Sequence, residues 1–230
     1  MDDPLRQTPP CLEIANRVEW LASDAPVPYP EAVAFMEQRA SAIAFGGARE
    51  CVWLLEHPAL YTAGTSADPA ELIASDRFPV FKTGRGGRFT YHGPGQRVAY
   101  VMLDLSRRGR DVRTFVRTLE AWMIAALGRL DVNGERRDDQ IGVFAGGAKI
   151  ASIGVRVRHW VTMHGVSLNV APDLEHFSGI IPCGLTSPVT SLAALGAETD
   201  MAVVDRVLRE TFAENFGGET VSANGPSRAR

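Results

Sequence analysis

The sequence has 230 residues, of which 45% are apolar and 22% charged, and this composition is typical of one globular domain with a sizeable core. The formal net charge of −3 gives no reason to expect a nucleic-acid partner. Residues 1–10 contain no apolar signal region, and no segment approaches the ~18–20 apolar residues of a membrane span, so we expect a cytoplasmic protein that does not bind membranes.

The first half of the chain predicts one helix among short strands. Residues 12–21 favour a strand, and residues 30–45 open with a proline and carry apolar residues at helical spacing. The apolar run 51–55 is typical of a buried strand, and it ends at residues 56–58 because the residue before a proline avoids helical geometry. Residues 78–83 and 97–105 favour strands on either side of a glycine-rich segment, residues 84–96.

The second half predicts two helices and a hairpin. Residues 112–130 carry apolar side chains at positions i, i+3, i+4 and i+7, the clearest helical pattern in the chain, and residues 201–216 favour a closing helix. Residues 141–144, 149–157 and 160–170 favour strands, and the last two lie close enough to pair. Residues 171–188 favour a loop. Strands outnumber helices, and the helices do not alternate strictly with them. This order predicts one α+β domain over residues 11–216, with flexible tails at 1–10 and 217–230.

Cys183 is the candidate nucleophile among three cysteines. No Cys-x-x-Cys pair is present, so neither a disulfide framework nor a thiolate zinc site is expected. Cys11 and Cys51 fit the usual role of a small buried apolar residue. Cys183 instead lies between a proline and a glycine in a loop, where a thiol can act beside a backbone N–H that stabilises an oxyanion. From the residues alone, an incidental loop thiol is an equal alternative.

Lys149 is unusual in a chain that otherwise uses arginine. Only Lys82 and Lys149 are lysines among the 24 basic residues. Lysine differs from arginine in that its amine can lose a proton near neutral pH when its surroundings favour it. Lys149 also follows two glycines at the start of an apolar run, where the backbone or a ligand can approach closely. The alternative is an ordinary charge at the edge of a strand.

The glycine-rich segment 84–96 contains five glycines, more backbone freedom than a hairpin needs. A phosphate-binding loop is one interpretation, although the segment matches neither the P-loop nor the dinucleotide-binding pattern, and a long turn without a ligand is the alternative. The five histidines lack the spacing of a metal site. His92 and His164 are each more typical of hydrogen-bonded structural residues than of catalysts.

Five segments taken together resemble the lipoyl(octanoyl) transferase family: Val52–Gly64, Arg85–Leu105, Gly146–Val157, His164–Val170 and Gly179–Gly184. The resemblance extends over about residues 52–191, and its most specific part is the run from Arg85 to Gln96. It implies a fold similar to that of biotin and lipoate protein ligases, with a mixed, largely antiparallel sheet that is flanked by helices and wraps an acyl tunnel.

The same resemblance implies the roles of individual residues. Cys183 would be the catalytic nucleophile, and Lys149 would lower the pKa of its thiol. The residues that would bind the substrate are Arg85, Gly86, Gly87, Arg88, Phe89, Thr90, Tyr91, His92, Ser152, Ile153, Gly154, Gly165, Val166 and Ser167. Arg88 and Phe89 fill the variable positions of the first motif.

The implied reaction is the first step of protein lipoylation. The enzyme would take an octanoyl group from octanoyl-acyl carrier protein and transfer it to a lysine of lipoyl domains, in 2-oxoacid dehydrogenase complexes and in the glycine-cleavage H protein. A thiol has an ordinary pKa near ~8.5, so an adjacent ammonium would increase the thiolate fraction. Neutral Lys149 could then accept a proton from the incoming amine. No nucleotide, metal or organic cofactor is expected, because a thioester is already activated.

Two alternatives and one surface feature stay open. The chain could be an ATP-dependent lipoate or biotin protein ligase, which would form an acyl-adenylate and need no nucleophilic cysteine. It could also be a non-catalytic module that binds acyl chains or lipoyl domains. The arginines between Arg107 and Arg117 favour either a solvated helix face or a docking patch for an acidic carrier or lipoyl domain.

Overall fold

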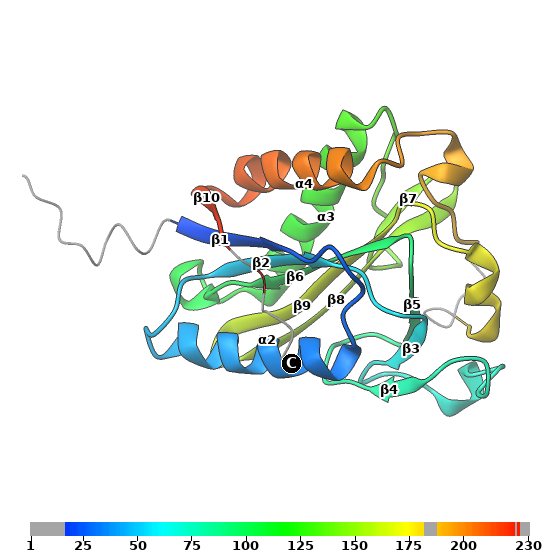
Figure 1. The fold of residues 1–230 in the computed structure, drawn as a ribbon, viewed down its shortest axis with the longest axis horizontal. Coiled ribbons are helices and arrows are strands. Elements are labelled where there is room, and N and C mark those ends of the chain that lie inside the picture. Colours follow the sequence, from blue (N-terminus) through cyan, green and yellow to red (C-terminus); the bar gives the residue numbers. More distant parts are fainter. Residues whose placement is uncertain (1–16, 182–187, 224, 226–230) are drawn as a thin grey trace, which may run out of the picture.

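A seven-stranded sheet with helices on both faces forms the body of the molecule, which the computed structural model describes over residues 17–181, 188–223 and 225 (Figure 1). In spatial order the strands are β10 (Glu219–Ser222), β1 (Arg17–Ala22), β2 (Cys51–Leu55), β6 (Gln96–Met102), β9 (Val161–Asn169), β8 (Ala148–Arg158) and β7 (Val143–Ala145). The pairs β10–β1 and β1–β2 are parallel, and the other four are antiparallel. The α+β class with a mixed, largely antiparallel sheet is therefore confirmed.

Strand alternation divides the core into two layers. Val52 and Leu54 of β2 pack with α3 (Val112–Arg129) and α4 (Met201–Phe216), which cover one face of the sheet. Trp53 and Leu55 of the same strand pack with α2 (Tyr29–Ala44) on the other face. Because β2 is buried on both faces, its sequence is a continuous apolar run rather than an alternating one. Figure 1 shows α3 and α4 on one side of the sheet and α2 on the opposite side.

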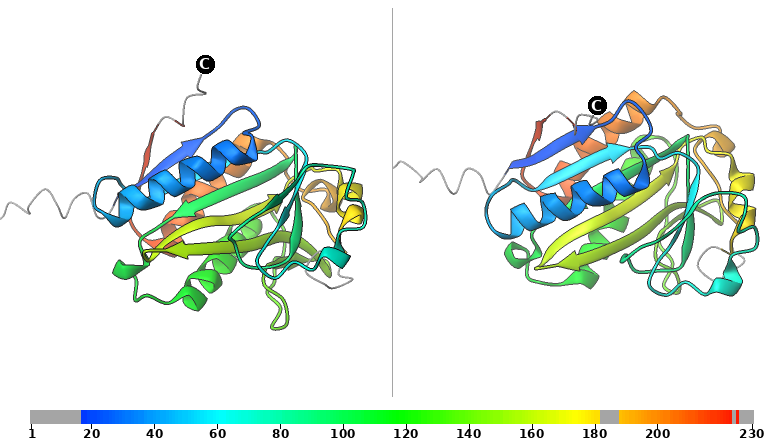
Figure 2. Two further views of the ribbon diagram at one scale, coloured as in Figure 1. Left: turned by 90° about the horizontal axis from the view of Figure 1, so that it is seen from below. Right: turned by 60° about the horizontal axis from the view of Figure 1, so that its bottom comes forward.

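A second sheet of three strands packs at one end of the molecule, beside the 3-10 helix η3 (Leu174–Gly179; Figure 2). Its order is β4 (Val80–Lys82), β3 (Leu60–Ala63) and β5 (Phe89–His92). β4 was predicted from the sequence, but β3 and β5 were not, because each is four residues long and β5 lies inside the glycine-rich segment. Phe89 and Tyr91 both point into one cluster with Phe177, an alternation that could have identified β5.

The helix predictions and the hairpin of β8 and β9 are confirmed within one or two residues. The described residues also form the 3-10 helices η1 (Pro69–Glu71), η2 (Leu105–Arg107) and η5 (Ala193–Leu195). In the described ranges, no helix is both long enough and apolar enough to cross a lipid bilayer.

The prediction of a flexible tail after residue 216 was wrong for Glu219–Ser222, which form β10. This strand pairs in parallel with the free edge of β1, where Arg17 and Glu219 form an ion pair at 2.8 Å. Arg209 of α4 donates hydrogen bonds to the oxygens of Thr220 and to the Ser222 hydroxyl. A polar segment is held here by hydrogen bonds and backbone pairing, which apolar periodicity does not reveal.

Candidate active site

A pocket lies between the α2 face of the large sheet and the small sheet, with about 540 Å³ of unfilled space including its mouth. All three segments expected to bind substrate contribute to its wall. The lining residues are Tyr29, Arg85, Gly87, Arg88, Phe89, Thr90, His92, Val98, Tyr100, Lys149, Ser152, Ile153, Gly154, His164, Gly165, Val166 and Ser167.

The register of the central strands brings these segments together. Ser152 pairs with Ser167, and Gly154 pairs with Gly165, across β8 and β9. On the other side of β9, Val98 and Tyr100 of β6 pair with Ser167 and Gly165. Since alternate residues of a strand face the same side of a sheet, these positions all face α2.

Two expected substrate residues, Gly86 and Tyr91, are not part of the pocket wall. Tyr91 points away from the pocket into the small-sheet cluster, where its hydroxyl lies 2.8 Å from His176 Nδ1. Four lining residues were not expected: Tyr29, Val98, Tyr100 and His164. Tyr29 comes from the first turn of α2, far from every motif in the sequence, so only the tertiary packing could identify it.

Lys149 is buried at the beginning of β8, with 5% of its surface exposed. Its Nζ lies 5.4 Å from the centre of the Phe144 ring, an aromatic contact favourable to a cation. Gly142 makes room for this side chain, because a Cβ at that position would lie 2.8 Å from Lys149 Cε and 2.7 Å from the Ala151 carbonyl oxygen. The Gly142 N–H donates to the buried Glu120 carboxylate at 3.1 Å, and this hydrogen bond holds Gly142 against the Lys149 side chain. Lys149 is therefore a held internal lysine, not a strand-edge charge.

The expected nucleophile Cys183 lies outside the described residues, as does Cys11. The described chain on both sides of residues 182–187 is held at the pocket. The Lys149 N–H donates to the Pro188 carbonyl at 2.8 Å, and the Thr190 N–H donates to the Lys149 carbonyl at 2.9 Å. On the other side, the Ile181 N–H donates to the carbonyl of Glu71, whose carboxylate pairs with Arg88 of the pocket wall.

Cys51 is unsuited to act as a nucleophile. It is fully buried in the core beneath α2, and its burial raises the pKa of its thiol to about 12. A thiolate, not a thiol, attacks carbonyl groups. Cys51 therefore has the structural role expected from its sequence.

Arg85 binds backbone carbonyls beside the pocket and is 8% exposed. Its guanidinium donates hydrogen bonds to the carbonyl oxygens of Thr62, Gly86 and Arg88 at 2.9–3.1 Å. Gly154 permits this packing, because a Cβ there would lie 3.0 Å from Arg85 Cδ. Arg85 thus fixes the glycine-rich segment against β3 and β8 and places a positive charge next to the pocket.

Three histidines and two tyrosines form a buried polar cluster at the α2 side of the pocket: His57, His92, His164, Tyr29 and Tyr100. Burial lowers the pKa of His57 to about 4, and burial together with the charge of Arg85 lowers that of His164 to about 3. Burial also lowers the pKa of His92. The three imidazoles are therefore neutral at neutral pH. Among the described residues, no group of three or more His, Cys, Asp or Glu side chains is placed to hold a metal ion.

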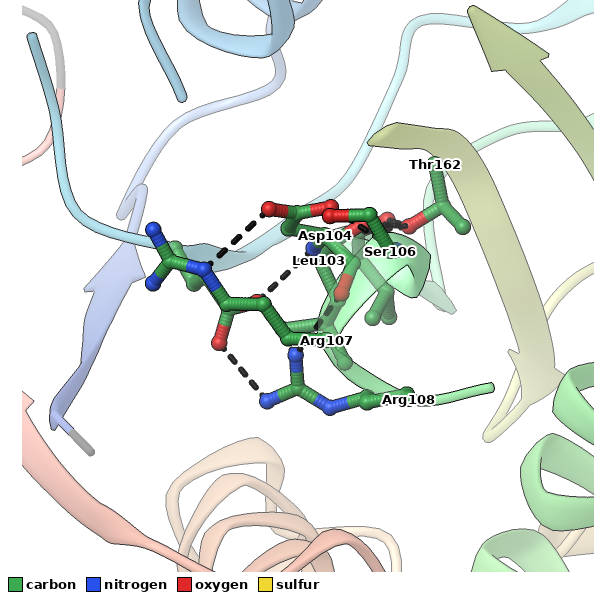
Figure 3. Close-up of polar contacts among 8 residues, drawn as sticks. Leu103, Asp104, Ser106, Arg107, Arg108 and Thr162 are labelled. Carbon is green, nitrogen blue, oxygen red and sulfur yellow. Dashed lines mark hydrogen bonds and ion pairs between the residues drawn. The ribbon is translucent and has the colours of Figure 1, made fainter. Parts of the chain in front are cut away.

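The arginines between residues 107 and 117 do not form one surface. Figure 3 shows Arg107 beside the Asp104 carboxylate and Arg108 turned toward Asp104. The Arg107 Nε lies 3.2 Å from the Asp104 carboxylate. Arg108 also forms an ion pair with the buried Glu50. The exposed pair Arg113 and Arg117 instead lines a surface groove, together with Arg136, Arg137, Asp138 and Asp139.

Comparison with known proteins gives consistent matches over nearly the whole chain. The model of the lipoyl protein ligase A/B catalytic domain matches residues 28–213. The octanoyltransferase of Parvibaculum lavamentivorans is 62% identical over 208 residues, covering 86% of this chain and 92% of that protein. That of Paramagnetospirillum magneticum is 60% identical over 208 residues, covering 88% of this chain and 98% of its own. Among solved structures, lipoate-protein ligase A bound with ATP has a TM-score of 0.71 over 92% of this chain and 90% of its own, at 15% identity, so it shares the fold.

Proposed function

This chain belongs to the lipoyl protein ligase A/B catalytic domain family, and we propose that it transfers an octanoyl group from an acyl carrier protein to a lysine of a lipoyl domain. Octanoyl transfer is the activity named for relatives about 60% identical to it over most of their length. The observation that carries the mechanism is the backbone pairing of buried Lys149 with Pro188 and Thr190, which follow the Cys183 segment directly in the chain.

In the first half-reaction, the Cys183 thiolate attacks the carbonyl carbon of the octanoyl thioester. The new C–S bond forms as the bond to the carrier's sulfur breaks, and the carrier leaves as a thiolate that takes a proton from the Lys149 ammonium, which leaves Lys149 neutral. The Lys149 ammonium favours the thiolate form of Cys183 by its charge. One thioester is exchanged for another, so this step needs no further source of energy.

In the second half-reaction, the amine of a lipoyl-domain lysine attacks the acyl-enzyme carbonyl. An amide forms, the Cys183 thiolate leaves, and neutral Lys149 accepts the proton that the amine loses. An amide is more stable than a thioester, which makes the transfer strongly favourable. Buried Lys149 could serve both steps, because an amine can change its protonation state where a guanidinium cannot.

The pocket suits the acyl chain. Its wall includes Val98, whose apolar side chain lies on the α2 face of the sheet, and the glycines Gly154 and Gly165. Each methylene removed from water contributes about 0.8 kcal/mol of binding free energy. Arg85 and the neutral histidines lie beside the same space, so polar groups restrict where an apolar chain can settle.

A nucleotide-dependent ligase is the second candidate, since a lipoate-protein ligase bound with ATP has the same fold. Intact-mass analysis after mixing the protein with octanoyl-carrier, without ATP, separates the two. The expected result is an increase of one octanoyl group that Cys183→Ala abolishes and Cys51→Ala preserves. Label on Cys11 or Cys51, or label that requires ATP, would overturn the proposed mechanism.

A further inference from the structure

The His164 side chain lies on the opposite side of the sheet from the one that strand alternation in β9 predicts. Val166 and Leu168 pack toward α3 and α4, while Met163 packs toward α2, so alternation places His164 on the α3 side. Its ladder partner Val155 does pack there. His164 nevertheless lies against Tyr29 and Tyr100 on the α2 side, because its φ is +61°. L-amino acids other than glycine rarely adopt this left-handed backbone conformation. Here the unfavoured conformation turns the imidazole toward the pocket.

The His164 imidazole is buried and only partly satisfied. The residue is 6% exposed, and its Nε2 lies 3.3 Å from the Tyr29 hydroxyl. Its Nδ1 is buried without a hydrogen-bond partner in the described structure. Most buried polar groups in folded proteins are satisfied, so an unsatisfied one facing a pocket requires an explanation.

His164 lies at the opposite end of the pocket from Lys149. Its partner Val155 is six residues along β8 from Lys149, which corresponds to about 20 Å at ~3.3 Å per residue. With bonds of about 1.5 Å, an extended lysine side chain reaches at most ~7 Å and an octanoyl chain ~11 Å, and together they span about 18 Å. Laid along β8 from Lys149, an octanoyl group would therefore reach the level of His164.

We propose that His164, held by Tyr29, is the end wall of the acyl pocket and sets the length of the chain that the enzyme accepts. The proposal rests on the proposed octanoyl transfer and adds the residue that determines its chain-length specificity. A longer chain would press methylenes against a polar imidazole that it cannot satisfy. A shorter chain leaves part of the pocket empty. Each missing methylene lowers the affinity about fourfold, which is equivalent to ~0.8 kcal/mol.

The test is a competition between acyl groups in one tube. Octanoyl-carrier and decanoyl-carrier are supplied in equal amounts with a lipoyl domain, and the mass of the modified domain gives the ratio of products. This ratio does not depend on how much of the enzyme is folded. His164→Gly removes the side chain and tolerates the left-handed backbone. His164→Asn shortens the side chain, also tolerates this conformation, and decides the test if the glycine variant does not fold.

His159→Gly is the matched control. His159 is an exposed histidine in the turn of the same hairpin, it also has a left-handed backbone (φ +51°), and it is not part of the pocket wall. The expected result is a decanoyl-to-octanoyl ratio about fifteenfold higher in His164→Gly, from two methylenes at about fourfold each, a smaller rise in His164→Asn and no change in His159→Gly.

The outcomes separate this inference from the function on which it rests. An unchanged ratio in both His164 variants, or an equal rise in His159→Gly, would refute the end wall while octanoyl transfer stands. If the unmodified enzyme transfers no octanoyl group, the proposed function fails. Calorimetric affinities for octanoate and decanoate then test the wall without transfer, and an unchanged affinity ratio in the variants would exclude it.

Discussion

Replacement of His57 by asparagine should make the protein less sensitive to acid. His57 is completely buried, and its Nδ1 lies 2.6 Å from the Val27 carbonyl oxygen, so this nitrogen carries the proton and donates it. Its Nε2 lies 2.6 Å from the Tyr100 hydroxyl and must then accept from it. Protonation of Nε2 would break that bond and bury a charge. In His57→Asn, the amide nitrogen can still donate to Val27, and no titratable group is left at this position.

The size of the effect follows from the pKa of His57, which burial lowers from 6.5 to about 4. Between these two pH values the unfolded chain binds a proton that the folded chain does not, so stability rises with pH. The contribution of His57 is therefore complete above pH 6.5 and is lost as the pH falls toward 4. At about 1.4 kcal/mol per pKa unit, the loss is about 3 kcal/mol.

Urea unfolding at pH 7.5 and pH 4.5 measures this difference. The free energy of unfolding of the unmodified protein should fall by about 2–3 kcal/mol more than that of His57→Asn. The carboxylates titrate equally in both proteins, so their contribution cancels. His159→Asn, which removes an exposed imidazole, should behave like the unmodified protein. Equal losses in His57→Asn and the unmodified protein would show that burial does not hold His57 neutral.

Two further predictions concern the reaction. Lys149→Arg should still form some acyl-enzyme but slow transfer to the lipoyl domain about 100-fold or more, because a guanidinium cannot accept the amine's proton. Single-turnover mixing with carrier and then with lipoyl domain measures the two steps. Wild-type rates in both steps would show that Lys149 contributes only its positive charge and accepts no proton. Arg113→Glu with Arg117→Glu should raise the apparent KM for the carrier and flatten its salt dependence, whereas Arg129→Glu, at the other end of α3, should not. An unchanged KM would leave Arg113 and Arg117 as a solvated face.

Local periodicity predicted the helices and most strands of the large sheet, because each of these elements buries a regular face. The motifs predicted most of the pocket wall, since the register of β8 with β9 places residues 152–154 opposite residues 165–167. Tyr29 could not be predicted, because it enters the wall only when α2 packs on the sheet. The orientation of His164 depends on its left-handed backbone, which opposes strand alternation, so a period-two pattern would place the side chain on the other side of the sheet.

The placement of the charges explains how one pocket can hold both a reactive amine and an apolar chain. Arg85 is a permanent cation, but three carbonyl oxygens accept its hydrogen bonds, so it is a fixed part of the wall. Burial and the charge of Arg85 together keep His92 and His164 neutral, so this end of the pocket gains no second charge near neutral pH. Lys149 lies about 20 Å along β8 from the ladder partner of His164, beside the Phe144 ring and next to the chain that leads to Cys183. In the proposed mechanism, the lysine that changes its protonation state is thus kept apart from the histidines that stay neutral, and the strand register maintains the separation.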